Sequence, residues 1–270
     1  MKGVTQMKSK FVNPALFKLE RRKGLSALIW FSVITGVLVF VTCALFSTVQ
    51  QILSDNEMLS KLGISLTSMA EYFDAEAVQM WMLPVLLFVA CSVVSTTTGE
   101  FRNGSFELIY SLNVSRTEVV RTKFVKVVLD IVIINLVAFL MALVGMAIFA
   151  KGDFNFVNLL VYLLIAICVS IQVAMFVFAI ALLGKKRMNM FGGVILVLVS
   201  YLLCTLMNVG ADKSTQWLGF FTPLSTLNGS IMQNGFAGLF KNGIVLLVWT
   251  AVSVVLFVCG ILKFKKEDLV

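Results

Sequence analysis

The sequence contains no histidine and few charged residues, and both shortages exclude whole classes of protein. Of its 270 residues, 13% are charged and 59% are hydrophobic, against roughly 25% and 45–50% in ordinary soluble domains. Without histidine there is no imidazole to serve as general base, metal ligand or triad member. The sequence also lacks a GxxxxGK[ST] phosphate loop, so the chain cannot hydrolyse ATP by that chemistry. We therefore expect a membrane protein that is not itself an enzyme, with no catalytic residues, metal site or cofactor of its own.

Cysteine is sparse and shows no functional spacing. Five cysteines occur singly in apolar stretches, and no CxxC pair suggests zinc, redox chemistry or a disulfide framework. We expect buried apolar thiols instead. They are Cys43, Cys91, Cys168, Cys204 and Cys259.

Long apolar runs are what the sequence has in abundance. A transmembrane helix needs about 20 apolar residues, and in hydrocarbon each backbone amide must be paired within its own segment. Nothing alternates with the period of a barrel strand. The sequence predicts an all-α membrane protein, a single transmembrane domain over residues 1–270. The six predicted spans are Gly24–Val49, Val78–Thr98, Val127–Ala150, Phe156–Gly184, Met190–Met207 and Gly243–Leu262.

The net charge of +8 is distributed unevenly between the loops. Seven lysines and arginines precede the first span, five lie between the second and third, three follow the fourth, and three occupy the tail. Only Lys61, Lys151, Lys213 and Lys241 fall on the other side. Because cytoplasmic loops retain positive charge, both termini are predicted to be cytoplasmic. No soluble domain carries the basic residues, so we expect no nucleic-acid partner.

The segment before the first span, residues 1–23, has the pattern of an interfacial helix. Asn13 and Pro14 form a helix-start signature. Leu16 and Leu19 then fall on one face, whereas Lys18, Arg21 and Arg22 fall on another. The residues expected to form this helix are Leu16, Leu19, Glu20, Arg21 and Arg22. A short basic stop before the first span is the alternative.

The second loop, residues 99–126, is long for a bundle connection and dense in charge and aromatic residues. Phe106, Ile109 and Tyr110 have helical spacing. Ser115 and Glu118 form a capping box that starts another helix, on which Arg116 and Lys123 share a face. A short surface helix of this kind suits docking to a soluble partner, and a solvated basic loop is the alternative.

The external segment 209–242 is too apolar for an ordinary solvated loop, although glycines, asparagines and Pro223 interrupt it. Short re-entrant helices, buried by protein, fit this composition. The competing interpretation is a poorly packed surface loop.

Polar residues inside the spans are few. Asp130 lies one turn after Lys126, so an ion pair is at least as good an explanation as a proton relay. Asn135 and Gln172 are expected to bond across helices. Ala166, Ser170 and Ala174 place small side chains on one stripe of the fourth span, which permits close helix packing.

Two strings in this context resemble the ABC-2 type permeases, the membrane subunits of bacterial ABC exporters. They are Phe17-Lys18-Leu19-Glu20-Arg21-Arg22-Lys23 and Gly99-Glu100-Phe101-Arg102-Asn103-Gly104-Ser105-Phe106-Glu107. That family typically has a glutamate, a Gly followed by Thr or Ser, a Pro-x-Ser-Arg element and a downstream lysine. Here these places are taken by Glu100, Gly104, Ser105, Ser115, Arg116 and Lys123, and Asn113 stands where proline is common.

The resemblance implies an exporter of two permease chains and two ATPase subunits in a bacterial plasma membrane, with ATP and Mg on the ATPases. The second permease would be identical or different. The second loop would be the coupling helix, with Phe106 and Tyr110 as apolar anchors and Glu100, Glu107, Arg116 and Lys123 making charged contacts. The implied coupling residues are Glu100, Arg102, Gly104, Ser105, Phe106, Glu107, Tyr110, Ser115, Arg116 and Lys123.

The cargo and mechanism stay open on the sequence alone. Apolar spans with few buried charges suit a hydrophobic or amphipathic cargo such as a peptide, and small drug-like molecules are a second option. An ATP-independent secondary transporter or channel would need an intramembrane charge pair, broken helices or a polar pore, and Pro84 alone does not supply these. A membrane enzyme has the least support, since no nucleophile and base are visible.

Overall fold

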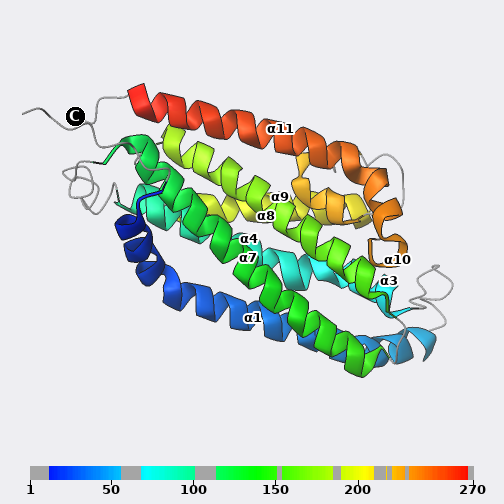
Figure 1. Cartoon of the computed structure of the whole chain (residues 1–270). Helices are drawn as coiled ribbons and strands as arrows, with labels where there is room; N and C mark the ends of the chain where they lie inside the picture. The colour runs from blue at the N-terminus through cyan, green and yellow to red at the C-terminus, as the bar shows by residue number, and fades with distance from the viewer. Residues whose placement is uncertain are drawn as a thin grey trace, which may run out of the picture.

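The computed structural model describes residues 12–55, 68–100, 114–150, 154–184, 190–209, 217, 221–228 and 231–266. Throughout these residues the regular structure is helical, without a strand. Long helices run side by side along one common direction (Figure 1). This arrangement confirms the predicted all-α class.

Five helical segments are long and apolar enough to cross a membrane. They belong to α1 (Pro14–Asp55), the second span, α7 (Arg116–Phe149), α8 (Phe156–Gly184) and α11 (Phe236–Lys266). The sixth predicted span corresponds to α9 (Met190–Val209), whose apolar part, Met190–Leu206, is shorter than the others. At 1.5 Å per residue, the 20 residues of α9 reach about 30 Å, the thickness of the hydrocarbon core. Six spans therefore remain a prediction.

The second span is built from three pieces. A π-helical turn η1 (Val78–Met82) leads into α4 (Leu83–Val94), and a second π-helical turn η2 (Ser95–Gly99) follows it. In η2, the hydroxyls of Thr96, Thr97 and Thr98 donate to carbonyls three or four residues earlier. π-Helical turns often mark functional positions, and η2 ends immediately before Glu100.

The N-terminal helix begins where the sequence predicted. The side chain of Asn13 accepts hydrogen bonds from the backbone N–H groups of Ala15 and Leu16, at 3.1 and 3.2 Å. However, the predicted boundary at Gly24 is wrong, because α1 continues through it into the first span. Figure 1 shows the first turns of α1 bent away from the rest of the helix.

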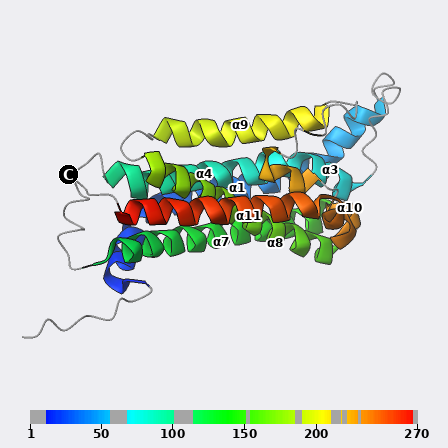
Figure 2. The ribbon, with the colours of Figure 1, turned by 90° about the horizontal axis from the view of Figure 1, so that it is seen from above.

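Helix α8 occupies the centre of the bundle and α11 lies on its outside. Of the apolar stretch of α8, 67% is buried, against 17% for α11. Helices α4, α7 and α11 all pack on α8, and Figure 2 shows α9 on the side where it packs on α4. The small residues Ala166, Ser170 and Ala174 are fully buried, which agrees with the close packing expected of that stripe.

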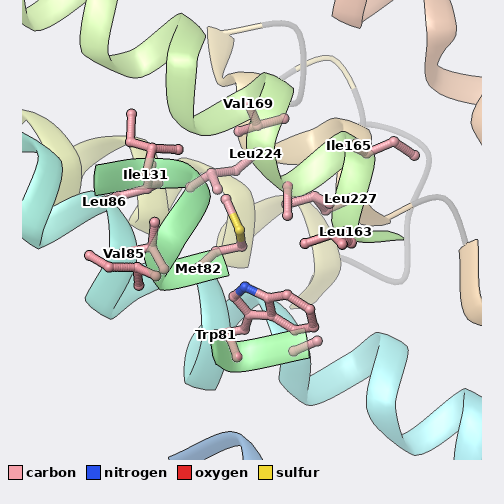
Figure 3. Close-up of a cluster of buried hydrophobic side chains, with 14 of the residues drawn as sticks. Trp81, Met82, Val85, Leu86, Ile131, Leu163, Ile165, Val169, Leu224 and Leu227 are labelled. Carbon is pink, nitrogen blue, oxygen red and sulfur yellow. The ribbon is translucent and has the colours of Figure 1, made fainter. Parts of the chain in front are cut away.

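The described part of the segment 209–242 contains short helices, as the sequence predicted. Helix η5 (Pro223–Asn228), a 3₁₀ helix, packs on α8, α9 and α11, and α10 (Ile231–Asn234) packs on α8 and on α3 (Met69–Ala77). Leu224 and Leu227 are buried among side chains of η1, α4, α7 and α8 (Figure 3). The described part of this segment is thus packed into the bundle.

One turn in this region requires glycine. Gly235, between α10 and α11, has a φ of 54°, a left-handed conformation that side chains disfavour. A Cβ atom there would also lie 2.5 Å from Oδ1 of Asn158.

The prediction that all five cysteines are buried is wrong for two of them. Cys43 and Cys204 are buried and Cys91 is partly buried, whereas Cys168 and Cys259 are exposed on the outside of the bundle. Among the described residues, none of the five forms a disulfide. In a membrane-spanning helix, an outward-facing apolar thiol contacts lipid rather than water, so periodicity in an all-apolar run does not reveal which face is buried.

A buried hydrogen bond joins the second span to α7. The indole N–H of Trp81 donates to Oδ1 of Asn135 at 2.9 Å, and both residues are fully buried. The indole also packs against Tyr162 and Phe73, with ring centroids 5.2 and 6.3 Å away. Figure 3 places Trp81 beside Met82 in the core.

Replacing Trp81 by Phe should lower stability, because the Asn135 oxygen loses its donor in a dry environment. Interhelical hydrogen bonds in membranes contribute about 0.6 kcal/mol on average and up to about 1.7. We expect Trp81→Phe to lower the Tm in detergent, whereas Trp30→Phe, at a 65% exposed position, should not. Equal Tm values for the two variants would contradict this role of Asn135.

Candidate functional site

The predicted coupling residues divide into two groups in the structure. Glu100, Ser115, Arg116 and Lys123 belong to the described residues. The surface helix predicted around Phe106 lies outside them, as do Arg102, Gly104, Ser105, Phe106, Glu107 and Tyr110. What the structure shows is how the loop is attached at each end.

At its beginning, the loop leaves a cluster of charges of which all but Lys23 are buried. Glu100, directly after η2, forms an ion pair with Lys123 of α7, and both residues are buried. Lys23 of α1 approaches the same carboxylate at 3.5 Å and Glu20 at 3.7 Å. The cluster of Glu20, Lys23, Glu100 and Lys123 therefore connects three helices, and we call it the charge cluster.

Lys123 also donates to the backbone carbonyl of Thr96 in η2. A π-helical turn disturbs the regular pattern of carbonyl acceptors, and the ammonium group satisfies one of them. Since Lys123 is only 4% exposed, leaving its charge unpaired would be costly. The contact therefore fixes the end of the second span against α7.

A second buried lysine strengthens the same junction one turn further along α7. The ammonium of Lys126 lies 2.7 Å from Oδ2 of Asp130 and donates to the hydroxyl of Ser92 in α4 at 3.2 Å. A Cβ at Gly24 of α1 would lie 2.5 Å from this ammonium. The ion pair of Asp130 with Lys126 predicted from their spacing is confirmed.

At its far end, the loop joins α7 through the predicted cap. The backbone N–H of Glu118 donates to the hydroxyl of Ser115 at 3.3 Å, which confirms the start of this helix. The guanidinium of Arg116 donates to the carbonyl of Phe264 near the end of α11, at 3.5 Å. Phe264 is buried against Val120 and Leu182, so the C-terminal end of α11 supports the start of α7.

These positions change the interpretation of two coupling residues. The sequence suggested that Glu100 and Lys123 make charged contacts with a partner, yet both are buried and paired with each other. Arg116 and Lys123 also have different surroundings in the structure, although their spacing in the sequence predicts that they share one face of the helix. In this structure Glu100 and Lys123 thus stabilise the junction of the second span with α7.

The buried and exposed faces of the N-terminal helix differ in part from those that the sequence predicted. Leu16 is buried beside Val119 of α7, whereas Leu19 is 47% exposed. Arg21 and Arg22 are exposed, but Glu20 points inward and is 1% exposed. The face that packs on the bundle thus consists of a leucine and a glutamate rather than of apolar residues alone.

Polar side chains deeper in the spans bond between helices, as predicted. Asn135 accepts from Trp81. The amide of Gln172 in α8 donates to the hydroxyl of Thr250 at 2.6 Å and to the carbonyl of Leu246 at 3.1 Å, both in α11. Among the described residues, no group of three or more histidine, cysteine or acidic side chains could hold a metal ion.

At the opposite end of the bundle, Asp74 binds the backbone of α10. Its carboxylate accepts hydrogen bonds from the backbone N–H groups of Met232 and Gln233, at 3.0 to 3.3 Å, at the start of α10. Burial raises the pKa of Asp74 to about 6, although these hydrogen bonds act to lower it. Asn158 donates to the carbonyl of Met232 at 2.7 Å, so α10 is held from two sides.

The family profile that matches this sequence is described as multidrug efflux system permease Rv1217c, C-terminal domain, and it matches residues 16–265. The chain belongs to this permease family. Comparison with curated proteins gave no match. Membership makes the chain the permease of an efflux system and an integral membrane protein that works with other transporter components.

The burial of two residues of the permease site could not be recognised from the sequence. Glu20 and Lys126 were both named there, but each lies in a basic segment whose residues are expected at the surface. Only the packing of α1 on α7 shows that they are buried. A useful signal would have been Gly24, because a glycine in the middle of a basic helix leaves room for a neighbouring side chain.

The charge cluster leads to a double-mutant prediction. Lys123→Met leaves the buried carboxylates of Glu100 and Glu20 to share the half-exposed Lys23, so it should reduce stability by about 3 kcal/mol. Combining Lys123→Met with Glu100→Gln should cost less than the sum of the two single changes. Thermal unfolding in detergent would measure this coupling. The distant pair Lys263→Met and Glu76→Gln should be additive, and additivity in the cluster as well would refute the ion pair.

The raised pKa of Asp74 leads to a pH prediction for the permease. A carboxyl that holds its proton more tightly in the folded state favours folding at low pH, and this contribution is lost as pH rises from about 4 to about 6. Asp74→Asn keeps an oxygen that can accept from Met232 and cannot ionise. We expect this variant to lose that pH step and to be more stable than the natural permease at pH 7.5. Glu76→Gln, on the same helix, is the control and should retain the change of stability with pH. If this variant loses the change as well, Asp74 is not the group responsible for it.

Proposed function

We propose that this permease is the membrane subunit of an ATP-driven exporter of the ABC-2 type. In this proposal two permease chains, identical or different, form the transport path and two separate ATPase subunits bind ATP and Mg. The chain itself performs no hydrolysis, in keeping with the lack of a phosphate loop in its sequence. The proposal extends the family assignment, which concerns efflux permeases in general.

The observation that supports it most is the way the second loop is attached. The loop leaves the second span at Glu100, in the charge cluster, and enters α7 at Ser115, beside the end of α11. Both attachments are made by hydrogen bonds and buried ion pairs rather than by flexible chain. A push on the loop would therefore reach the second span, α7, α1 and α11 directly.

Such a push can drive transport only if the bundle has two conformations and the ATPase partner binds one of them more tightly than the other. The two π-helical turns of the second span are suited to this, since they alter the backbone hydrogen bonding where the span begins and ends. In our proposal, closure of the ATPases moves the coupling loop, and η2 passes the movement to α4. The path between the two permeases then opens.

We further propose that the charged end of the bundle faces the cytoplasm of a bacterium. The starts of α1 and α7 and the end of α11 meet at this end (Figure 1), with Lys18, Arg21, Arg22, Lys263 and Lys265 exposed there. Positive residues favour the cytoplasmic side. The α3 and α10 end would then be external.

The cargo that fits best is a hydrophobic or amphipathic molecule. Few charged side chains lie inside the spans, and Asp130 is already paired with Lys126. The name of the matching family refers to multidrug efflux, which favours small amphipathic compounds over the peptide that the sequence alone also allowed.

The proposal is tested at the coupling loop. Interface energy concentrates in buried aromatic anchors, so Phe106→Ala should weaken retention of the ATPase subunits by about 1–3 kcal/mol. It should also reduce cargo-stimulated ATP hydrolysis at equal membrane expression. Lys213→Ala, in the predicted external segment, is the control and should retain both. The measurement is co-purification from cells that express the permease with its neighbouring genes.

Two results would count against the proposal. If Phe106→Ala and Lys213→Ala behave alike, the second loop is an ordinary basic connection. If the purified permease alone moves cargo across a vesicle membrane without ATP, the secondary transporter or channel becomes the better assignment.

A further inference from the structure

A small cavity lies between α1 and α7 at the charged end of the bundle. It has a volume of about 110 Å³ and is lined by Phe17, Arg21, Lys126, Leu129, Asp130 and Ile133. These two helices run side by side (Figure 1) and pack along much of their length. Arg21 and Leu129 are exposed, so the cavity opens to the side of the bundle, where lipid would be.

The charges lining the cavity favour an anion. Lys126 and Asp130 neutralise each other through their ion pair at 2.7 Å. Arg21 is near enough to Asp130 to interact with its charge, but none of the ion pairs among the described residues involves Arg21. The lining therefore has a net positive charge, carried by a guanidinium group, whose donors suit two oxygens of a phosphate.

An apolar track leads from the cavity along α7. Leu129, Leu136 and Leu140 are 45%, 43% and 56% exposed, and with Ile133 they follow at intervals of four, three and four residues, which places them on one helix face. From Leu129 to Leu140 the helix rises about 16 Å. This distance is about half the thickness of the hydrocarbon core, the depth of one leaflet.

A phosphate site followed by an apolar track of one leaflet's depth has the chemistry of a phospholipid. We propose that the groove between α1 and α7 binds an anionic phospholipid of the cytoplasmic leaflet, with its phosphate at Arg21 and an acyl chain along Leu129 and Leu136. The location in that leaflet rests on the proposed orientation. Basic pockets between spans on the cytoplasmic side are known to bind lipid head groups.

The test is binding of short-chain phosphatidylglycerol to the full-length permease in a neutral detergent, measured by native mass spectrometry. Arg21→Gln should weaken binding about fivefold, the effect of one cation near a membrane surface. Arg22→Gln is the matched control, since Arg22 is the adjacent exposed arginine and does not line the cavity. It should change binding less than twofold. Both side chains are exposed, so both variants should fold.

Two further comparisons separate a lipid from free phosphate. Leu129→Ser should weaken phosphatidylglycerol binding, and inorganic phosphate should not displace the lipid. Equal effects of Arg21→Gln and Arg22→Gln, or equal binding of phosphatidylcholine and phosphatidylglycerol, would overturn the proposal. So would displacement by phosphate together with unchanged binding by Leu129→Ser, which would assign the cavity to a soluble anion. Because the assay needs neither ATPase nor transport, its failure is distinct from failure of the exporter assignment.

Discussion

The arrangement of the bundle depends on the pairing of charges where α1, the second span and α7 meet. A charge taken out of water is costly unless a partner and hydrogen bonds compensate it. Lys123 has Glu100 and the carbonyl of Thr96, and Lys126 has Asp130 and Ser92. Each lysine belongs to α7 and each has a partner on the second span. A shift of either helix by one turn would separate Lys123 from Glu100 and Lys126 from Ser92, so these two contacts fix the register of the helices.

The remainder of the bundle is held by weaker contacts. Lipid tails are as apolar as leucine, so helices in a membrane associate through close packing and a few hydrogen bonds. α11 follows this pattern, with the amide of Gln172 bonded to Thr250 and Gly260 close to Ala179. α9 packs on the second span with Gly193 against Ala90 and Val94. These two helices can change their packing at smaller cost than the three that share the charge cluster.

The sequence predicted features set by local chemistry, and it missed those that depend on which face is turned inward. The apolar run from Phe156 to Gly184 coincides with α8, and the caps at Asn13 and Ser115 are where their side chains predicted. The spacing of Lys126 and Asp130 was sufficient to predict their ion pair. Helix α1, by contrast, continues through Gly24, and Glu20 is buried. Neither the continuation of α1 nor the burial of Glu20 could be predicted from the local sequence. Whether a residue in a basic segment is buried depends on a neighbouring helix that is far away in the sequence.

The two ends of the bundle are fastened by different chemistry, and this difference bears on how movement could pass along it. At the charged end the fastening is between side chains on three spanning helices. At the other end Asp74 accepts hydrogen bonds from backbone N–H groups of a short helix, α10, and Leu224 and Leu227 of η5 are buried in the core. Backbone contacts to a four-residue helix can be released without separating any spanning helices. The α10 end can therefore open locally while the charged end stays paired, so a rearrangement of the spans need not begin by breaking the charge cluster.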